Sequence, residues 1–570
     1  MSTTDDVRVP QRSGAIAATQ RLVRFNLVAA FLLHLAAFAC LVLTEADPLG
    51  RSLFLLTWGL LNFTWLLLLR RPVISAALSL AMVVIVILVS QFKFDITWMT
   101  ITFLDILIID SDTFAFLLKI FPDLRTSLLI AAAVAIPVAG LLWFCDRFRV
   151  RRRTSLAGGA LCLAGLITLS NQFPEQPWEP FQGVNHVSNF ARSGVLSVSE
   201  LSTKGWLEFD SAIANPTRPA RDQACAPTAR PPHIVMVLDE SSFDITMAPG
   251  IKVPPDYTDH FRSSDGKTRR LLTEATGGPT WYTEYNVLTG LSARSFGRLM
   301  FYVTRIAAGR VERGLPQALR RCGYKTVSLY PAYGAFLSAR RFQKTAGVER
   351  MIDSKEMGAG DVEPDRFYYD KALRLIEKEG KDTPLFIFVY TVANHFPWNT
   401  TFRPDLTPNW RPLGNVPEVD EYIRRQTMSA RDYSDFAGKL KKQFPDQKFL
   451  VVRFGDHPPA IAHRIIDPSL DDEEIARRVM NYDPRFYTAY YAIDGINFEP
   501  VASPSAHERL DAPYLPLVIQ EAAGLPLDST FLEQKRILQR CDGLFYACKD
   551  GAEARRFNRL LVDAGLIKGF

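Results

Sequence analysis

The chain has 570 residues, of which 48% are hydrophobic and 22% are charged, and its formal net charge is +6. A chain of this length is too long for one hydrophobic core, so two or more domains are expected. Much of the basic excess lies in short clusters beside long apolar segments, which is typical of membrane topology and argues against a nucleic-acid-binding protein.

Five apolar segments approach the roughly 20 residues that a membrane-spanning helix needs. They cover residues 25–45, 52–69, 73–91, 126–145 and 154–171. The first begins too far from the amino terminus, and is too long, to be a cleaved signal peptide. Arginine clusters precede the first segment, separate the second from the third and separate the fourth from the fifth. The positive-inside rule places these clusters in the cytoplasm, so the amino terminus is expected inside and the chain after residue 171 outside.

Two further stretches are expected at the membrane surface. Residues 98–108 are apolar but too short to span, which favours an interfacial or re-entrant helix. Residues 172–229 alternate apolar with polar groups and are interpreted as an amphipathic linker. The predicted organisation is therefore a five-helix transmembrane domain (1–171), this linker, and an extracytoplasmic globular domain (230–570).

Four cysteines lie in the part of the chain expected outside the membrane. An even number in an oxidising compartment suggests disulfides. Cys541 and Cys548 are close enough for a local bridge, which leaves Cys225 and Cys322 as the second pair. Four buried free thiols are the alternative.

The extracytoplasmic part alternates short apolar runs with helical stretches. The runs Ile234–Leu238, Thr326–Tyr330, Leu385–Thr391 and Phe449–Phe454 are typical of buried parallel strands. Helical patterns such as Leu315–Arg321 separate them, and this alternation predicts an α/β domain with a largely parallel sheet.

Acidic and histidine side chains follow three of these predicted strands. Glu240 follows the first, His395 the third, and Asp456 with His457 the fourth. Ligands of parallel sheets bind beyond the carboxyl ends of the strands, so these residues are expected at one rim. Taken singly, each also fits an ordinary loop residue. Together, Glu, Asp and His form a ligand set for Mn²⁺, Mg²⁺ or Zn²⁺.

Thr280 follows the turn Gly277-Gly278-Pro279 and precedes a predicted helix. A helix amino terminus favours a phosphate through its free N–H groups and its dipole. Thr280 is therefore a candidate nucleophile, since a metal lowers the pKa of a bound hydroxyl. A structural helix cap is the alternative.

In this order the motifs resemble a known family, the lipoteichoic acid synthase group of the alkaline phosphatase and sulfatase superfamily. They are Glu240-Ser241, Gly278-x-Thr280 with Glu284 four residues on, Asn394-His395-x-Pro397 and Gly455-Asp456-His457. Five spans ahead of an extracytoplasmic catalytic domain are also this group's layout. The resemblance covers most of the chain, is clearest over 230–460 and is thin over 460–570.

The resemblance implies a role for each matched position. Glu240, Asp456 and His457 match the metal ligands, which leaves Asp239 as a neighbour. Thr280 matches the nucleophile, which also touches the metal, and His395 matches a histidine that contacts the substrate phosphate or assists the leaving group. Arg340 and Glu284 are expected substrate contacts. The sequence departs from the pattern at Tyr330, where a histidine is expected, and at Leu337, where a tryptophan is expected.

The expected activity is metal-dependent transfer of phosphoglycerol from a membrane phospholipid, through phospho-Thr280, to a glycan or glycolipid. The expected cofactor is one divalent ion, with Mn²⁺ preferred over Mg²⁺ and Zn²⁺. The expected location is the cytoplasmic (inner) membrane, with several spans and a periplasmic or extracellular catalytic domain. The alternatives are phosphoethanolamine transfer at the same site, a membrane-anchored phosphodiesterase and a catalytically silent scaffold. The nucleophile context of sulfatases is absent around Thr280.

Overall fold

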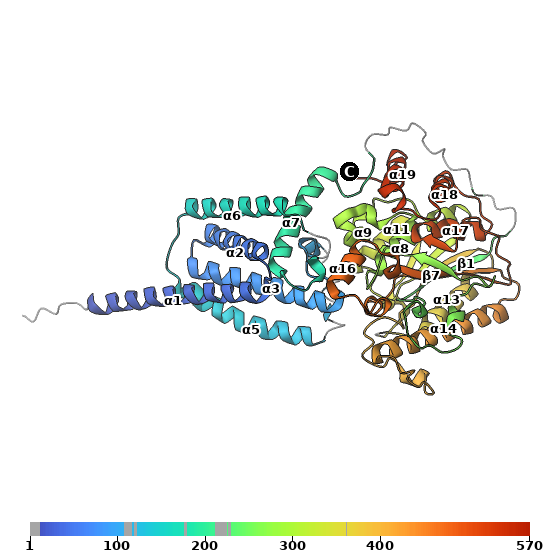
Figure 1. The fold of residues 1–570 in the computed structure, drawn as a ribbon, viewed down its shortest axis with the longest axis horizontal. Helices are drawn as coiled ribbons and strands as arrows, with labels where there is room; N and C mark the ends of the chain where they lie inside the picture. The colour runs from blue at the N-terminus through green and yellow to red at the C-terminus, as the bar shows by residue number, and fades with distance from the viewer. Residues whose placement is uncertain are drawn as a thin grey trace, which may run out of the picture. The chain divides into compact units, whose positions relative to one another are not determined.

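The chain forms two compact units, one of Met1–Leu107 with Leu117–Ser199 and the other built on Glu200–Phe570. The structure, a computed structural model, describes residues 12–97, 99–107, 114, 117–118, 122–175, 179–210, 225, 230–360 and 362–569. The first unit is helical, and the second combines helices with a sheet (Figure 1).

The first unit contains five helices that are long and apolar enough to cross a membrane, as predicted. They are α1 (Arg12–Thr44), α2 (Pro48–Leu69), α3 (Pro72–Thr97), α5 (Pro122–Cys145) and α6 (Arg152–Gln172). Many of their large apolar side chains are exposed, including Phe31, Leu43 and Ile136. Exposed apolar side chains in such number suit a lipid surrounding and not water.

A further helix, α7 (His186–Lys204), follows the last candidate span within the stretch expected to be a linker. Its first turn docks on the connection between α1 and α2, because the Glu45 carboxylate accepts hydrogen bonds from the Val187 N–H (3.0 Å) and the Ser188 hydroxyl (2.5 Å). Asn185 Nδ2 also donates to Asp47 (2.6 Å). The compact helical unit therefore continues to Ser199.

The helix expected over 98–108 is a short 3₁₀ helix, η1 (Phe103–Leu107), in the part that the structure describes. Asp105 lies at its start and accepts from Lys93 Nζ and the Thr102 N–H. This local capping by a carboxylate favours a tight turn. Trp98 and Ile108 lie outside the described residues.

The second unit is built on one eight-stranded sheet with the strand order β4-β3-β5-β1-β6-β7-β2-β8. The strands are β1 (His233–Asp239), β2 (Arg269–Leu272), β3 (Lys325–Leu329), β4 (Arg350–Ile352), β5 (Leu385–Tyr390), β6 (Phe449–Gly455), β7 (Thr488–Ile496) and β8 (Arg509–Asp511). β7 runs antiparallel to both of its neighbours, and the other pairings are parallel. The predicted α/β domain with a mostly parallel sheet is thus confirmed.

Helices cover the sheet, and alternate strand residues bury against them. Val235 and Val237 of β1 belong to a core with Ile376 of α13 (Asp365–Glu379) and Phe436 of α14 (Pro417–Gln443). The other helices of this unit are α8 (Thr280–Thr289), α9 (Val303–Ala307), α10 (Leu315–Arg321), α11 (Ala339–Ala346), α12 (Ser354–Met357), α15 (Ala462–Ile466), α16 (Asp472–Met480), α17 (Leu515–Ala522), α18 (Ser529–Cys541) and α19 (Ala552–Asp563). The central strands β1, β5 and β6 are consequently buried on both faces, which fits their mainly apolar sequences.

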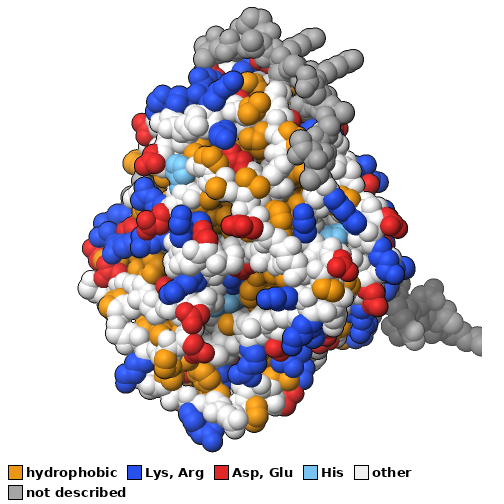
Figure 2. Space-filling model, turned by 90° about the vertical axis from the view of Figure 1, so that its right-hand side faces the viewer, with side chains coloured by type: hydrophobic (Ala, Val, Ile, Leu, Met, Phe, Trp, Pro, Cys, Tyr) orange, Lys and Arg blue, Asp and Glu red, His pale blue; other side chains and the backbone are white. Residues whose placement is uncertain are grey.

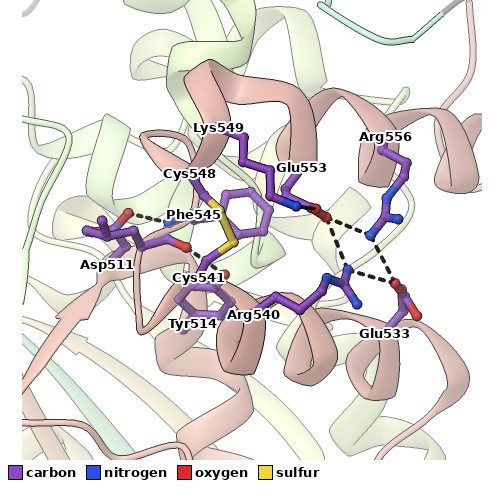
Figure 3. The surroundings of a disulfide bond; sticks show 11 residues. Asp511, Tyr514, Glu533, Arg540, Cys541, Phe545, Cys548, Lys549, Glu553 and Arg556 are labelled. Carbon is purple, nitrogen blue, oxygen red and sulfur yellow. Dashed lines mark hydrogen bonds and ion pairs between the residues drawn. A yellow bond between two sulfur atoms is a disulfide. The ribbon is translucent and has the colours of Figure 1, made fainter.

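Four cysteines of the second unit form two disulfides, Cys225–Cys322 and Cys541–Cys548. The second joins the end of α18 to the 3₁₀ helix η10 (Cys548–Gly551). Figure 3 shows beside it a group of ion pairs in which Glu553 is shared by basic side chains from three segments. This bridge and these ion pairs hold α18 and α19 together.

Figure 2 shows one face of the molecule, on which acidic and basic side chains are interspersed and hydrophobic side chains gather in small groups. A mixed surface of this kind is typical of a soluble globular domain.

Candidate metal centre and nucleophile

The register of the central strands brings the predicted ligands together. Asp239, the last residue of β1, pairs with Gly455, the last residue of β6. The next residues, Glu240 and Asp456, therefore leave the sheet side by side. β5 pairs with the opposite edge of β1, so the loop that carries His395 also starts at this rim.

Three buried side chains form the cluster at the rim. One ligand atom from each of Glu240, Asp456 and His457 lies within 4.8 Å of the others. His457 Nε2 is 3.3 Å from Asp456 Oδ2 and 3.9 Å from Glu240 Oε1. The Ser241 N–H donates to Asp456 Oδ1 (2.7 Å), which fixes that carboxylate.

The electrostatics of the cluster fit a bound cation. Burial raises the pKa of Glu240 well above its ordinary value, and the charge of Asp456 raises it further. Burial also raises the pKa of Asp456, against the lowering effects of His457 and of the Thr280 hydroxyl. Asp456 Oδ2 and His457 Nε2 are buried without a hydrogen-bond partner among the described residues, which is costly unless another ligand satisfies them. A divalent ion would satisfy both atoms and neutralise the paired carboxylates.

The backbone around the cluster is closely packed. A Cβ at Gly455 would lie 1.8 Å from the Ser242 carbonyl oxygen, so only glycine fits at this position. Ser241 adopts a left-handed conformation with φ of 51°. This conformation costs a non-glycine residue about 1 kcal/mol or more. The hydrogen bonds of Ser241 offset that cost, because its carbonyl accepts from Tyr422 Oη (2.8 Å) and its hydroxyl donates to Glu240.

Thr280 is the first residue of α8, as the sequence predicted. The helix is tied to the metal-ligand loop at two points. Gly277, with φ of 77°, donates its N–H to the Pro458 carbonyl (2.9 Å). The Thr283 hydroxyl donates to the Asp456 carbonyl (2.6 Å). These bonds hold the candidate nucleophile beside Asp456, at a helix amino terminus that favours phosphate.

Two side chains that position this turn were missed by sequence reasoning. His463, on α15, lies with Nε2 2.7 Å from the Thr276 hydroxyl, and burial lowers its pKa to about 4. Glu274 is buried and accepts from Asn286 Nδ2 (2.8 Å) and from the Ala293 N–H (2.6 Å). His463 could have been recognised from the sequence because it lies six residues after His457. Nothing in the sequence around Glu274 marks that residue.

His395 lies in the loop that follows β5 and is half-buried. Its Nδ1 is 2.8 Å from the Phe396 carbonyl, which can only accept, so Nδ1 carries the proton. Burial, with a smaller effect of the nearby His457, lowers the pKa of His395 to about 4. Neutral His395 therefore has a free lone pair on Nε2. Arg425 holds the loop by donating to the His395 and Pro397 carbonyls.

The two expected substrate contacts have other partners in the structure. Arg340 donates to Asp353 (2.7 Å), to Glu356 (2.8 Å) and to the Met351 carbonyl (2.9 Å). Glu284 is buried within α8, where its carboxylate accepts from Gln343 Nε2 (2.8 Å). Burial raises the pKa of Glu284 to about 7. Neither position favours the predicted contact, because the Arg340 guanidinium is paired and the Glu284 carboxyl does not face solvent.

Part of the second unit matches a known protein family. Residues 254–483 match the Sulfatase family, and this match contains Thr280, His395, Asp456 and His457. This stretch of the chain is thus similar to the Sulfatase family, which agrees with the resemblance to the alkaline phosphatase and sulfatase superfamily.

Individual relatives are more distant. The capsular polysaccharide biosynthesis protein RkpI of Rhizobium meliloti is 26% identical over 250 residues, which are 42% of this chain and 44% of that protein. The chain thus matches less than half the length of its curated relatives. The phosphoglycerol transferase GacH of Streptococcus pyogenes is 15% identical, covers 60% of this chain and 86% of that one, and has a TM-score of 0.45. The lipooligosaccharide phosphoethanolamine transferase A of Neisseria meningitidis is 13% identical, covers 87% of this chain and 99% of that one, and has a TM-score of 0.47.

Proposed function

We propose that this protein transfers a phosphoglycerol group from a membrane phospholipid, in the first instance phosphatidylglycerol, to an extracytoplasmic glycan or glycolipid. The observation that carries the proposal is the position of Thr280 at the start of α8, beside Asp456 in the cluster with Glu240 and His457. A hydroxyl at a helix amino terminus beside a divalent-ion site suits attack on a phosphodiester.

Glu240, Asp456, His457 and the Thr280 hydroxyl would hold the ion, with Mn²⁺ favoured and Mg²⁺ or Zn²⁺ as alternatives. Such an ion lowers the pKa of a hydroxyl that it binds and offsets charge on phosphoryl oxygens.

The first half-reaction conserves atoms and charge. The Thr280 hydroxyl loses its proton, its oxygen forms a bond to phosphorus, and the bond from phosphorus to the diacylglycerol oxygen breaks. We assign the proton to the free Nε2 of His395, which then returns it to the departing diacylglycerol oxygen. In the second half-reaction an acceptor hydroxyl attacks the phospho-threonine by the same route, and Thr280 is regenerated.

The topology proposed for this reaction puts the amino terminus in the cytoplasm and Glu200–Phe570 outside. The five candidate spans and the positions of the arginine clusters support this topology. With five spans, all the arginine clusters fall on the same side of the membrane, which the positive-inside rule assigns to the cytoplasm. The two disulfides of the second unit also suit an oxidising compartment. The five helices would keep the site at the lipid head groups, where the donor is concentrated.

A surface polysaccharide is the acceptor class that the comparisons favour, because a relative is described as a capsular polysaccharide biosynthesis protein. Phosphoethanolamine transfer is the second candidate, since the same cluster serves either head group. The residues after Thr280, Trp-Tyr-Thr-Glu, favour the phosphoglycerol side by resemblance. Water as the acceptor would make the protein a phosphodiesterase.

Mass spectrometry of the full chain tests the proposal directly. The protein, in nanodiscs of mixed phosphatidylglycerol and phosphatidylethanolamine with Mn²⁺, is quenched in acid and digested. We expect a phosphoglycerol mass on Thr280 that is absent from Thr280→Ala, and Thr280→Ser, which keeps a hydroxyl, serves as the matched variant. A phosphoethanolamine mass would select the second candidate, and full turnover by Thr280→Ala would refute the mechanism.

A further inference from the structure

Four aromatic side chains form a half-buried cluster directly beside the candidate nucleophile. The aromatic cluster comprises Trp281 and Tyr282 of α8, Phe301 of η5 (Ala293–Tyr302) and Phe336 of η6 (Phe336–Ser338). The ring of Trp281 lies 5.0 Å from that of Phe301 and 6.4 Å from that of Phe336, between centroids. Trp281 Nε1 also donates to the Phe301 carbonyl (2.8 Å), so the rings are held in place from three segments of the chain.

The position of the aromatic cluster restricts what can occupy it. Trp281 follows Thr280 in the chain, so a molecule that brings phosphorus to Thr280 passes within reach of these rings. Partly exposed rings grouped in this way suit an apolar or amphipathic partner. The apolar part of the proposed donor is its diacylglycerol end, and the acceptor glycan is polar throughout.

The stretch beside the aromatic cluster has an excess of arginine, part of which is paired, since Arg298 forms an ion pair with Glu200. From residue 285 to residue 311 the sequence contains four arginines and neither aspartate nor glutamate. This stretch includes η5, which packs against α8, and α9, which packs against α8 and α11. Figure 1 shows α8, α9 and α11 together. η5 buries Phe296 and Leu299, whereas Arg298 is exposed. A short basic and amphipathic element with an aromatic side chain is typical of a surface that meets anionic lipid.

The same element adjoins the segment through which the chain enters the second unit. Trp206 lies two residues after the end of α7, and its ring is 5.5 Å from that of Phe296 in η5. Arg298 forms an ion pair with Glu200, on the last turns of α7 (3.4 Å). Leu201 of the same turns is 42% exposed. The end of α7 and the segment after it therefore contact η5, the element that also supplies Phe301 to the aromatic cluster.

From these contacts we infer that the aromatic cluster receives the diacylglycerol end of an anionic phospholipid, and that η5 forms part of the membrane-facing surface of this unit. The inference rests on the proposed function, because it assigns the cluster to the donor of that reaction. The rings would hold the leaving diacylglycerol while the bond from Thr280 to phosphorus forms and the bond from phosphorus to the diacylglycerol oxygen breaks. The diacylglycerol oxygen takes up one proton and returns to the bilayer as an alcohol.

Donor chain length separates this role from a structural one. The full chain in detergent micelles is given dihexanoyl or dioleoyl phosphatidylglycerol, and the rate of label transfer to Thr280 is measured in single turnovers. Phe336→Ala and Phe301→Ala each withdraw a ring, and Phe336→Leu is the matched control that keeps an apolar side chain. We expect each alanine variant to lose about tenfold in kcat/KM with the dioleoyl donor and less than about threefold with the dihexanoyl donor, as loss of apolar contact with the chains predicts.

Three results would overturn the inference. Equal losses with both donors would mean that the rings only support α8. A loss confined to the second half-reaction, seen as a raised KM for the glycan, would assign the cluster to the acceptor. No loss with either donor would leave the rings without a part in turnover. Absence of any label on Thr280 in the unmodified protein would instead refute the proposed function, and the inference with it.

Discussion

Glu284 gives the sharpest test of the electrostatics around α8. Its carboxyl is buried and its pKa is raised from 4.5 to about 7, chiefly by burial. A carboxyl whose pKa is higher in the folded state than in the unfolded state stabilises the fold fully below pH 4.5, and this contribution is lost as the pH rises through 7. The shift corresponds to about 3 kcal/mol by pH 8, at 1.36 kcal/mol for each pKa unit.

Glu284→Gln replaces the carboxyl with an uncharged group of the same shape. Its amide can accept from Gln343 Nε2 as the carboxyl does, and Gln343 Oε1, which is buried without a partner, can accept in return. The variant should therefore match the unmodified protein in stability at pH 4.5 and exceed it by up to about 3 kcal/mol at pH 8. Other buried carboxyls, such as Asp365, titrate in both proteins and cancel in the comparison.

The assay is thermal unfolding of the full chain in detergent at pH 4.5, 6 and 8, with the metal concentration held constant. Glu553→Gln is the matched control, for which the expected change in stability with pH has the opposite sign. The pKa of Glu553 is lowered, since hydrogen bonds and charges from Lys549, Arg540 and Arg556 outweigh the effect of its burial. That variant should lose stability at pH 8 and approach the unmodified protein at low pH. A difference for Glu284→Gln that does not change with pH, or a loss at pH 8, would refute the reasoning.

Three further predictions concern the metal, the nucleophile turn and the disulfides. Asp456→Asn should abolish turnover and should also abolish the binding of one Mn²⁺ per chain in equilibrium dialysis. Chelation should inactivate the unmodified protein, and added Mn²⁺ should restore its activity. Full activity after exhaustive chelation would count against a metal enzyme. His463→Ala should lower kcat about tenfold with KM little changed, and His463→Gln should restore part of the rate by bonding Thr276, whereas an effect on KM alone would exclude a positioning role. Cys225→Ser should destabilise the second unit by about 4 kcal/mol and Cys541→Ser by about 2 kcal/mol, because the Cys225–Cys322 bridge closes a far longer loop. Equal melting temperatures for the two variants would contradict this prediction.

The sequence predicted the parts of the fold that local pattern controls. Short, mainly apolar runs marked β1, β3, β5 and β6, and long apolar segments marked the five candidate spans. β2, β4 and β8 are three or four residues long and owe their pairing to the neighbouring strands, so no local pattern reveals them. The sequence did not predict how α7 packs, because the hydrogen bonds from Val187 to Glu45 and from the preceding Asn185 to Asp47 join residues about 140 positions apart.

The candidate site likewise has a part that the local sequence pattern predicts and a part that it does not. Glu240, Asp456 and His457 follow strand ends, so sheet topology alone brings them together. The partners of Arg340 and Glu284 depend on Asp353, Glu356 and Gln343, which lie on helices and loops whose packing no motif records. Motifs place ligands at the ends of strands, whereas the side chains that hold those ligands in position come from tertiary packing.

The neighbours Asp239 and Glu240 show how the strand itself separates two carboxylates. Successive residues of a strand point to opposite faces, so two adjacent acids at its end diverge. Asp239 accepts from His260 Nε2 (2.7 Å) and Tyr490 Oη (2.7 Å), and these partners hold its pKa below the ordinary value despite burial. Glu240 has Asp456 and His457 beside it and its pKa is raised. Asp239 is thus a charged anchor that fixes the end of β1, and this leaves Glu240 as the carboxylate available to a metal ion.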